Sequence, residues 1–226
     1  MKALLIFLGT FLLSLSSVQS QDFNWANIRT EDKHILSAEA AWDYALGFGL
    51  GYAYRPSTQA PLWLTAGFSF PSGEKLLDDF KTKVGGQIRV AQAGNFQVIA
   101  SVQGIYRRYE SQLVRLQNLG LESRVMVGYY HPKWFVGGEL GFDWAIATQF
   151  RHSEEFRQNT YAKLQDGWAA SPTGGNFAYG LQGGYSFGRN DLVLKIGGLA
   201  SQGLETAPMI PLYAQFSFNF EVGKAK

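Results

Sequence analysis

The chain contains no cysteine and few charged residues. Without cysteine it cannot form a disulfide, a thiolate metal site or the lipid-modified cysteine of a lipoprotein. Only 17% of its 226 residues are Asp, Glu, Lys or Arg, whereas a soluble domain carries about a quarter. This shortage of charge indicates that much of the surface does not face water. The 20 basic and 18 acidic residues nearly cancel, so nothing indicates binding to nucleic acid.

Long apolar runs are absent apart from one at the N-terminus. Lys2 precedes an apolar run from Ala3 to Leu15, and a short polar run containing Val18 and Ser20 follows. This order is typical of a secretory signal peptide with cleavage between Ser20 and Gln21. The run is too short to span a membrane comfortably as a helix. We therefore expect a signal peptide over 1–20 and a single exported domain over 21–226.

The exported part alternates between large apolar residues and small or polar residues. From residue 44 to 54, tyrosines, leucines and a phenylalanine alternate with glycines and alanines. Because successive side chains of a strand point to opposite faces, such a segment has one apolar face and one small or polar face. The pattern predicts ten strands, at roughly 35–42, 44–55, 61–70, 83–92, 95–108, 113–130, 133–150, 175–187, 190–202 and 211–222.

Two segments leave the strand count and geometry open. From Leu36 to Tyr44 every second residue is apolar, without a break between the first two segments. This pattern is compatible with one long strand and with a barrel of eight strands. The segment 113–130 changes parity near Asn118, which predicts a β-bulge or a rim loop. Aromatic residues near the strand ends predict two interfacial girdles, made of Tyr52, Tyr54, Tyr106, Tyr129, Trp134, Phe150 and Phe187.

The apolar faces carry no charge at the strand centres, and the opposite faces carry charges of both signs. A soluble barrel of the lipocalin sort, which is the alternative, would be dense in Lys and Glu on its outer face. Here the polar face is mostly Gly, Ala, Ser and Gln, which favours the interior of a narrow barrel. A lysine or arginine that faces lipid at mid-membrane costs about 2–4 kcal/mol. The pattern therefore predicts an all-β fold, a transmembrane antiparallel up-and-down β-barrel. Its predicted lumen charge network is Arg89, Arg107, Glu122, Arg124, Glu139, Asp143 and Lys195, with Glu221 on the same faces.

Short and long connections alternate along the chain. Bacterial barrels place short turns in the periplasm and long loops outside the cell, so both ends of the barrel domain are expected in the periplasm. The longest connection, 151–174, is then extracellular and carries Phe156, Tyr161 and Trp168. These aromatics are candidate contacts for a partner protein or a glycan. The alternative is a loop that covers the barrel mouth.

The export signal, the alternating strands and a final strand with Phe216, Phe218 and Phe220 resemble small outer-membrane barrels of the OmpX/OmpA type. The resemblance covers nearly the whole exported part. It implies a Gram-negative outer membrane, contact with outer-membrane lipid, and assembly by the barrel-assembly machinery, which reads the last strand. Members typically end on an aromatic residue, whereas Glu221 to Lys226 follow here.

Residues for catalysis are scarce. His152 and Ser153 adjoin, and adjacent side chains on an extended chain point apart, so they do not form a base–nucleophile pair. No cofactor or metal is predicted. The sequence favours a non-enzymatic, structural or surface-interaction role with a charge-paired, porin-like lumen. The ion pairs fit a stiffened, filled interior, and a narrow diffusive channel for small solutes is the second hypothesis. A lipid-modifying enzyme is the third.

Overall fold

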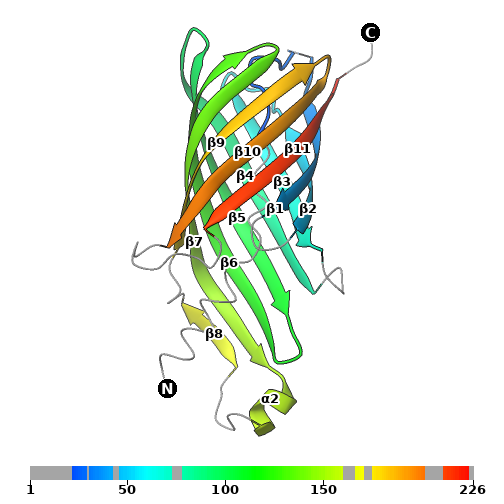
Figure 1. Ribbon diagram of the computed structural model, residues 1–226, viewed down its shortest axis with the longest axis vertical. Coiled ribbons are helices and arrows are strands. Elements are labelled where there is room, and N and C mark those ends of the chain that lie inside the picture. Colours follow the sequence, from blue (N-terminus) through cyan, green and yellow to red (C-terminus); the bar gives the residue numbers. More distant parts are fainter. Residues whose placement is uncertain are drawn as a thin grey trace.

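The computed structural model describes residues 22–29, 31–42, 46–72, 78–159, 166–170, 175–201 and 211–223. Over these residues the chain is almost entirely β-strand, and Figure 1 shows the strands wound around a common axis. The predicted signal peptide, residues 1–20, lies outside the described residues.

Ten of the described strands form a closed antiparallel barrel. Each pairs with the next along the chain, and the first pairs with the last, so no edge remains. The prediction of ten strands is confirmed. The alternative of eight is wrong, because the first two segments are separate strands that pair with each other from His34↔Tyr54 to Trp42↔Leu46. The barrel strands are β1 (His34–Trp42), β2 (Leu46–Tyr54), β3 (Leu62–Pro71), β4 (Asp79–Ala93), β5 (Phe96–Glu110), β6 (Val114–His131), β7 (Trp134–His152), β9 (Gly175–Phe187), β10 (Asn190–Ser201) and β11 (Leu212–Val222).

Two further elements lie beyond the ring. The short strand β8 (Gly167–Ala170) pairs with β7 over 147–150, past the last residue of β7 that pairs with β9. The helix α2 (Glu154–Asn159) precedes β8, and Figure 1 shows both at the bottom of the barrel. Among the described helices, none is long and apolar enough to cross a membrane.

The two ends of the barrel differ. We call one the turn end: it holds the connections 55–61, 94–95, 132–133 and 188–189, the start of β1 and the end of β11. The opposite end, the loop end, holds the remaining connections. β5, β6 and β7 have 15, 18 and 19 residues, whereas roughly 9–11 residues cross a membrane in a tilted strand. These three strands are therefore long enough to extend past the membrane, and Figure 1 shows that they reach farther than the other strands at the loop end.

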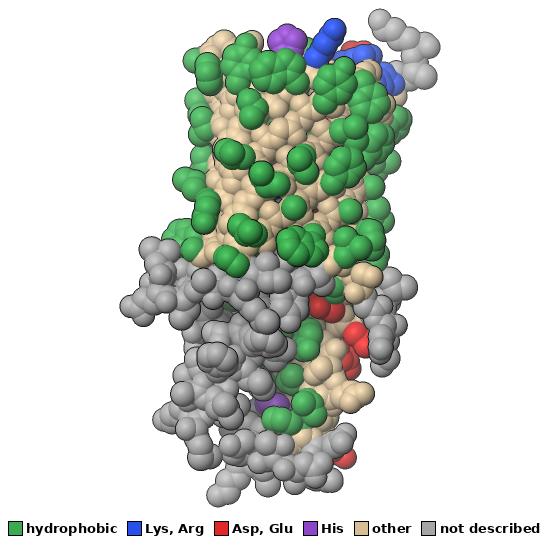
Figure 2. Space-filling view, viewed as in Figure 1, with side chains coloured by type: hydrophobic (Ala, Val, Ile, Leu, Met, Phe, Trp, Pro, Cys, Tyr) green, Lys and Arg blue, Asp and Glu red, His purple; other side chains and the backbone are tan. Residues whose placement is uncertain are grey.

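The outer surface of the barrel is an apolar band. Leu50, Leu140 and Leu181 are 63%, 68% and 63% exposed, and their neighbours in sequence face the lumen. Figure 2 shows this band around the upper part of the barrel, with Lys, Arg and His side chains on the rim above it. So large an exposed apolar surface requires lipid around it, as in a transmembrane barrel.

A β-bulge interrupts the pairing of β6 with β7. Leu119 pairs with Ala147 and Gly120 with Ala145, so Ile146 is the extra residue. The sequence predicted an irregularity near Asn118, and the register shifts there. The extra residue, however, belongs to the partner strand, because β6 keeps one parity from Val114 to His131.

Beyond the bulge, the alternation of β7 is reversed: even-numbered residues face the lumen side and odd-numbered residues face outward. Phe150 pairs with Leu116, which is buried on the lumen side, and Thr148 is also buried. Phe150 therefore faces the lumen side of the extension, and its predicted place in the outer aromatic girdle is wrong. Gln149 faces outward, although its parity in the sequence is that of the lumen-facing Glu139 and Asp143.

Candidate functional site: a filled lumen

The segment that precedes β1 lies inside the barrel at the turn end. We call it the plug and define it as residues 22–32, of which 30 lies outside the described residues. Asp22, Phe23 and Asn24 are at most 3% exposed. Asp22 is the second residue after the predicted cleavage site, so the plug would form the beginning of the exported chain.

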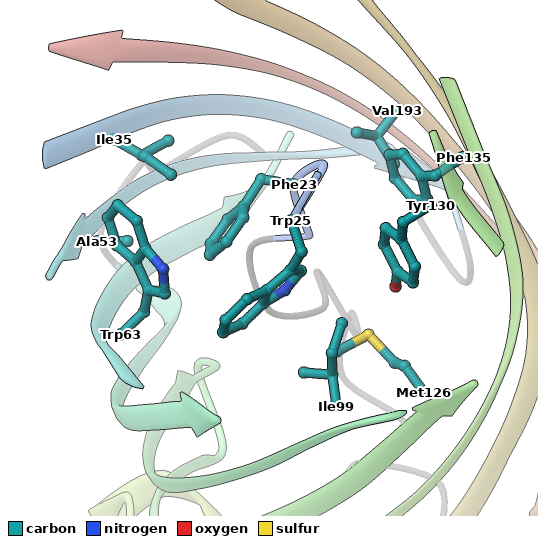
Figure 3. Close-up of a cluster of buried hydrophobic side chains, with 10 residues drawn as sticks. All are labelled: Phe23, Trp25, Ile35, Ala53, Trp63, Ile99, Met126, Tyr130, Phe135 and Val193. Carbon is teal, nitrogen blue, oxygen red and sulfur yellow. The ribbon is translucent and has the colours of Figure 1, made fainter. Parts of the chain in front are cut away.

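The plug contributes two aromatic side chains to an apolar core within the lumen. The Phe23 ring lies 5.4 Å from Trp25 and 5.2 Å from Trp63, centroid to centroid. Burial of each such side chain stabilises the fold by about 2–3 kcal/mol. Figure 3 shows both in the middle of the barrel, surrounded by side chains of the strands, namely Ile35, Ala53, Trp63, Ile99, Met126, Tyr130, Phe135 and Val193.

Hydrogen bonds tie the plug to the strands at the turn end. The side-chain amide of Asn24 donates to the carbonyl of His131 and to Ser186 Oγ, each at 2.8 Å. The backbone N–H of Asn24 donates to Asp191 Oδ2 at 3.0 Å. Asn219 Nδ2 donates to the carbonyl of Asp22 at 2.7 Å. These hydrogen bonds thus pair buried polar groups of the plug with polar groups of the wall.

Asp22 also enters an ion-pair network that crosses the lumen. Its carboxylate pairs with Lys195 Nζ on β10 and lies 3.9 Å from Arg124 on β6. Lys195 Nζ and Arg124 also meet Glu139 Oε2 on β7, at 3.0 and 3.5 Å. All four side chains are at most 3% exposed, so the charges are desolvated and depend on one another.

The network continues toward the loop end through Glu122. Arg124 Nη2 donates to Glu122 Oε1 at 2.7 Å, and Lys83 Nζ on β4 donates to Glu122 Oε2 at 2.6 Å. The connected set therefore contains three carboxylates and three cations and is neutral. Without the plug it would hold two carboxylates against three cations. Its members are Asp22, Glu122, Glu139, Lys83, Arg124 and Lys195.

Tyr213 on β11 completes the surroundings of Glu139. Its hydroxyl donates to Glu139 Oε1 at 2.6 Å. The ring fits because two facing positions are glycine: a Cβ on Gly180 or Gly197 would lie 2.5 Å from the Tyr213 side chain. These glycines make room for an inward aromatic ring and do not form a phosphate loop.

The other predicted lumen charges lie outside this connected set. Arg107 pairs with Asp143, and its Nη1 donates to Asn118 Oδ1 at 2.9 Å. Arg89 lies nearer the turn end, where it is 3.5 Å from Gln97 Oε1 and 6.0 Å from the centroid of the Trp25 ring. The structure thus joins Glu122, Arg124, Glu139 and Lys195, sets Arg107 and Asp143 apart as a pair, and places Arg89 against the plug.

The predicted loop contacts are not brought together. The Phe156 ring stacks on His152 at 5.7 Å. Trp168 is on β8 and is 56% exposed. Tyr161 lies outside the described residues. His152 Nδ1 lies 3.0 Å from Asp166 Oδ1, while Ser153 Oγ accepts the N–H of Phe156, so His152 and Ser153 do not form a catalytic pair.

Ion pairs also stabilise the part of the barrel beyond the apolar band. Hydrogen bonds from Arg115 and Arg108 hold the pKa of Glu110 at about 2. The pKa of Asp166 is also lowered to about 2, by the backbone N–H and side chain of His152 and by Arg157. Both carboxylates are therefore ionised well below neutral pH. Among the described residues, no group of three or more His, Asp or Glu side chains could hold a metal ion.

The sequence pattern did not identify several of the lumen residues. Lys81 and Lys83 share the parity of Arg89; Lys83 begins the predicted strand 83–92 and was not counted among its charges, and a strand begun at residue 79 would have included Lys81 as well. Glu39 on β1 is also buried on the lumen side. No sequence pattern pointed to Asp22, because the plug has no alternation of apolar and polar residues that would mark it as part of the lumen.

The architecture can be compared with known proteins. No protein-family model and no curated protein matches the sequence. A solved structure, the COG4313 outer membrane channel from Pseudomonas putida F1, is similar with a TM-score of 0.56 and 10% identity over 89% of this chain and 100% of that one. The chain has the fold of an outer-membrane β-barrel.

More distant barrels are the KdgM porin and the outer membrane protease OmpT from Escherichia coli. KdgM gives a TM-score of 0.44 and 7% identity over 83% of this chain and 99% of that one. OmpT gives 0.42 and 8% over 85% and 98%. The likeness to the COG4313 channel, at 10% identity, shows the fold alone, and the predicted resemblance to the OmpX/OmpA type is not confirmed.

Proposed function

We propose that this protein is a non-conducting barrel of a Gram-negative outer membrane with a structural or surface-interaction role. The observation that carries the proposal is the filled lumen. The plug buries Phe23 and Trp25 among apolar side chains of the wall, and Asp22 neutralises the ion-pair network. Water-filled pores of membrane barrels have polar interiors, and an apolar core across the lumen opposes the passage of ions and polar solutes.

The remaining parts of the proposal follow from topology. The signal peptide is removed between Ser20 and Gln21, which frees the plug to enter the barrel. The turn end faces the periplasm, and the loop end, with the extensions of β5, β6 and β7, lies outside the cell. The extension presents polar side chains and the exposed Trp168 to a protein or glycan partner.

A channel for small solutes is the second candidate. The observation that favours it is the fold similarity to a protein described as an outer membrane channel. Conduction would require the plug to leave the lumen. That movement exposes Phe23 and Trp25 to water and leaves Lys195 with Glu139 as its ion-pair partner. We therefore expect the channel state to be much less populated than the closed state.

Conductance in planar bilayers separates the two candidates. The exported chain, residues 21–226, is compared with a variant that carries Asp22→Asn, Phe23→Ala and Trp25→Ala, which keeps every barrel strand intact. We expect no conductance above the lipid background for the natural chain and discrete steps for the variant. Steady conductance of similar size from both proteins would contradict a plug that closes the barrel and would favour the channel.

The location and surface role need separate measurements. The outer-membrane fraction should contain a protein whose gel mobility changes on boiling. The measured mass of this protein should be that of a chain that begins at Gln21. For the surface role, residues 153–174 are replaced by a Gly/Ser linker of about 12 residues, enough to reach from β7 back to β9. We expect folding to persist and crosslinked partners to be lost. Crosslinks that survive this replacement would exclude the loop as the contact.

A further inference from the structure

Lys81 on β4 is a buried cation in the loop-end half of the lumen. Its side chain points inward like that of Lys83, two residues along the strand, and it is 5% exposed. Within the described part of the chain, Lys81 makes no ion pair or hydrogen bond. A buried ammonium group is costly unless an opposite charge compensates it.

The charges around Lys81 are of both signs. Lys83 and Arg107 repel it, and Glu122 and Asp143 attract it without forming an ion pair with it. Across the strands, Lys81 pairs with Ser69 on β3 and with Arg107 on β5. Directly opposed side chains have Cβ atoms about 4.5–5.5 Å apart, and like charges there repel. The carboxylates of this region are already engaged, Glu122 by Lys83 and Arg124 and Asp143 by Arg107.

One further acid lies nearby. Asp79 is the next lumen-facing residue of β4 toward the loop end and is half-buried. It makes no ion pair with Lys81 among the described residues. An anion that reaches this level from the loop end would therefore pass Asp79 before it meets Lys81.

We propose that Lys81, Arg107 and Ser69 form a binding site for a small oxyanion, a phosphate or a carboxylate. An ammonium group, a guanidinium group and a hydroxyl all donate hydrogen bonds, and the two cations make them charge-assisted. An anion between Lys81 and Arg107 relieves their repulsion and supplies the missing opposite charge.

On the turn-end side of the site the lumen is occupied, so we assign the approach of the anion to the loop end. Toward the turn end, the Lys83–Glu122 pair, the rest of the network and the plug occupy the lumen. A bound anion is therefore captured and released from the outer side and does not cross the membrane. This ligand goes beyond the structural role proposed above and does not require conduction.

Thermal unfolding in detergent tests the site, with the loss of the unboiled gel mobility as readout. The exported chain is heated with 100 mM sodium phosphate or with sodium chloride at matched ionic strength. For a Kd of about 1 mM, phosphate should raise the midpoint by roughly 5–10 °C. Sodium acetate in a third arm shows whether a carboxylate serves as well as phosphate.

Lys81→Met is the test variant, and Lys133→Met, at an exposed turn, is its matched control. We expect Lys81→Met to be at least as stable as the natural chain in chloride and to lose the phosphate shift. Lys133→Met should keep it. Phosphate also stabilises proteins generally by exclusion from their surface. An equal shift in all three proteins, or no shift in the natural chain, overturns the proposal.

Ser69→Ala provides a second route if Lys81→Met does not assemble. It removes a hydroxyl without adding or removing a charge. The phosphate shift should fall by at least half with Ser69→Ala, and a shift that remains complete in this variant counts against the site.

Discussion

Replacement of Asp22 by Asn tests how the plug is held. Asn keeps the size of the side chain and the backbone carbonyl that accepts a hydrogen bond from Asn219. It removes the negative charge that pairs with Lys195 and approaches Arg124. The connected network then changes from three carboxylates and three cations to two and three. The result is one uncompensated positive charge in a lumen with little access to water.

The cost follows from the burial of the pair. Loss of one partner of a buried ion pair typically destabilises a protein by about 3–5 kcal/mol. Lys195 retains Glu139 at 3.0 Å, so we expect the lower end of this range, about 3 kcal/mol. For a chain of this length, a loss of about 3 kcal/mol lowers the unfolding midpoint by roughly 6–12 °C.

The assay is thermal unfolding in one detergent at neutral pH, followed by the heat-dependent change in gel mobility. Hydrogen exchange of residues 22–29 is the second readout, and it should become faster because the plug opens more often. Glu31→Gln is the matched control, since Glu31 belongs to the same segment and is exposed. It should change stability by less than about 0.5 kcal/mol.

A double-mutant cycle with Lys195→Met separates the ion pair from other effects. If the pair is the cause, the double variant is more stable than the sum of the two single effects. The reasoning is refuted if Asp22→Asn unfolds within about 0.5 kcal/mol of the natural chain. It is also refuted if exchange of the plug stays unchanged, or if the two substitutions are additive.

Three further predictions concern the outer face, Tyr213 and pH. Leu140→Arg places a charge in the apolar band and should destabilise the barrel by about 2–4 kcal/mol in lipid, whereas Gln149→Arg, beyond the bulge, should be tolerated. Tyr213→Phe removes the hydrogen bond to a buried carboxylate and should cost about 1.5–3 kcal/mol in urea unfolding. Glu110 has a folded pKa of about 2 against an ordinary 4.5. Its contribution to the free energy of unfolding is therefore present above about pH 4.5 and is lost as pH falls through about 2. Chemical-shift titration of Glu110 measures the folded pKa.

Each of these has its own control. Tyr185→Phe, at an outward position that is 58% exposed, should leave stability unchanged, and an equal loss in both tyrosine variants would argue against the role of the lumen hydrogen bond. Equal damage from arginine at 140 and at 149 would contradict the bulge. A midpoint near pH 4.5 for Glu110 would show that its two arginine partners do not hold it in solution.

The strands could be predicted because their two faces meet different environments. Lipid selects large apolar residues on one face and a narrow lumen selects small or polar residues on the other, which leaves a period of two in the chain. Parity also placed Arg124, Glu139 and Lys195 on the lumen side before any contact was known. The pattern could not show which charge meets which, because partners such as Lys83 and Glu122 are 39 residues apart and come from different strands.

Two features required the tertiary structure. A single extra residue at Ile146 exchanged the faces of Gln149 and Phe150, and a strand pattern read by parity alone carries no mark of such a shift.

The plug is the larger case. Alternation alone determined the class of the protein, a membrane barrel with a polar face inside, because a strand between two environments must alternate. The choice of ten strands over eight required the pairing of β1 with β2. That the lumen is filled was decided only by the fold. Phe23 and Trp25 are apolar residues of an irregular segment, and their burial depends on Trp63, Ile99 and other side chains that distant strands bring together once the barrel has closed.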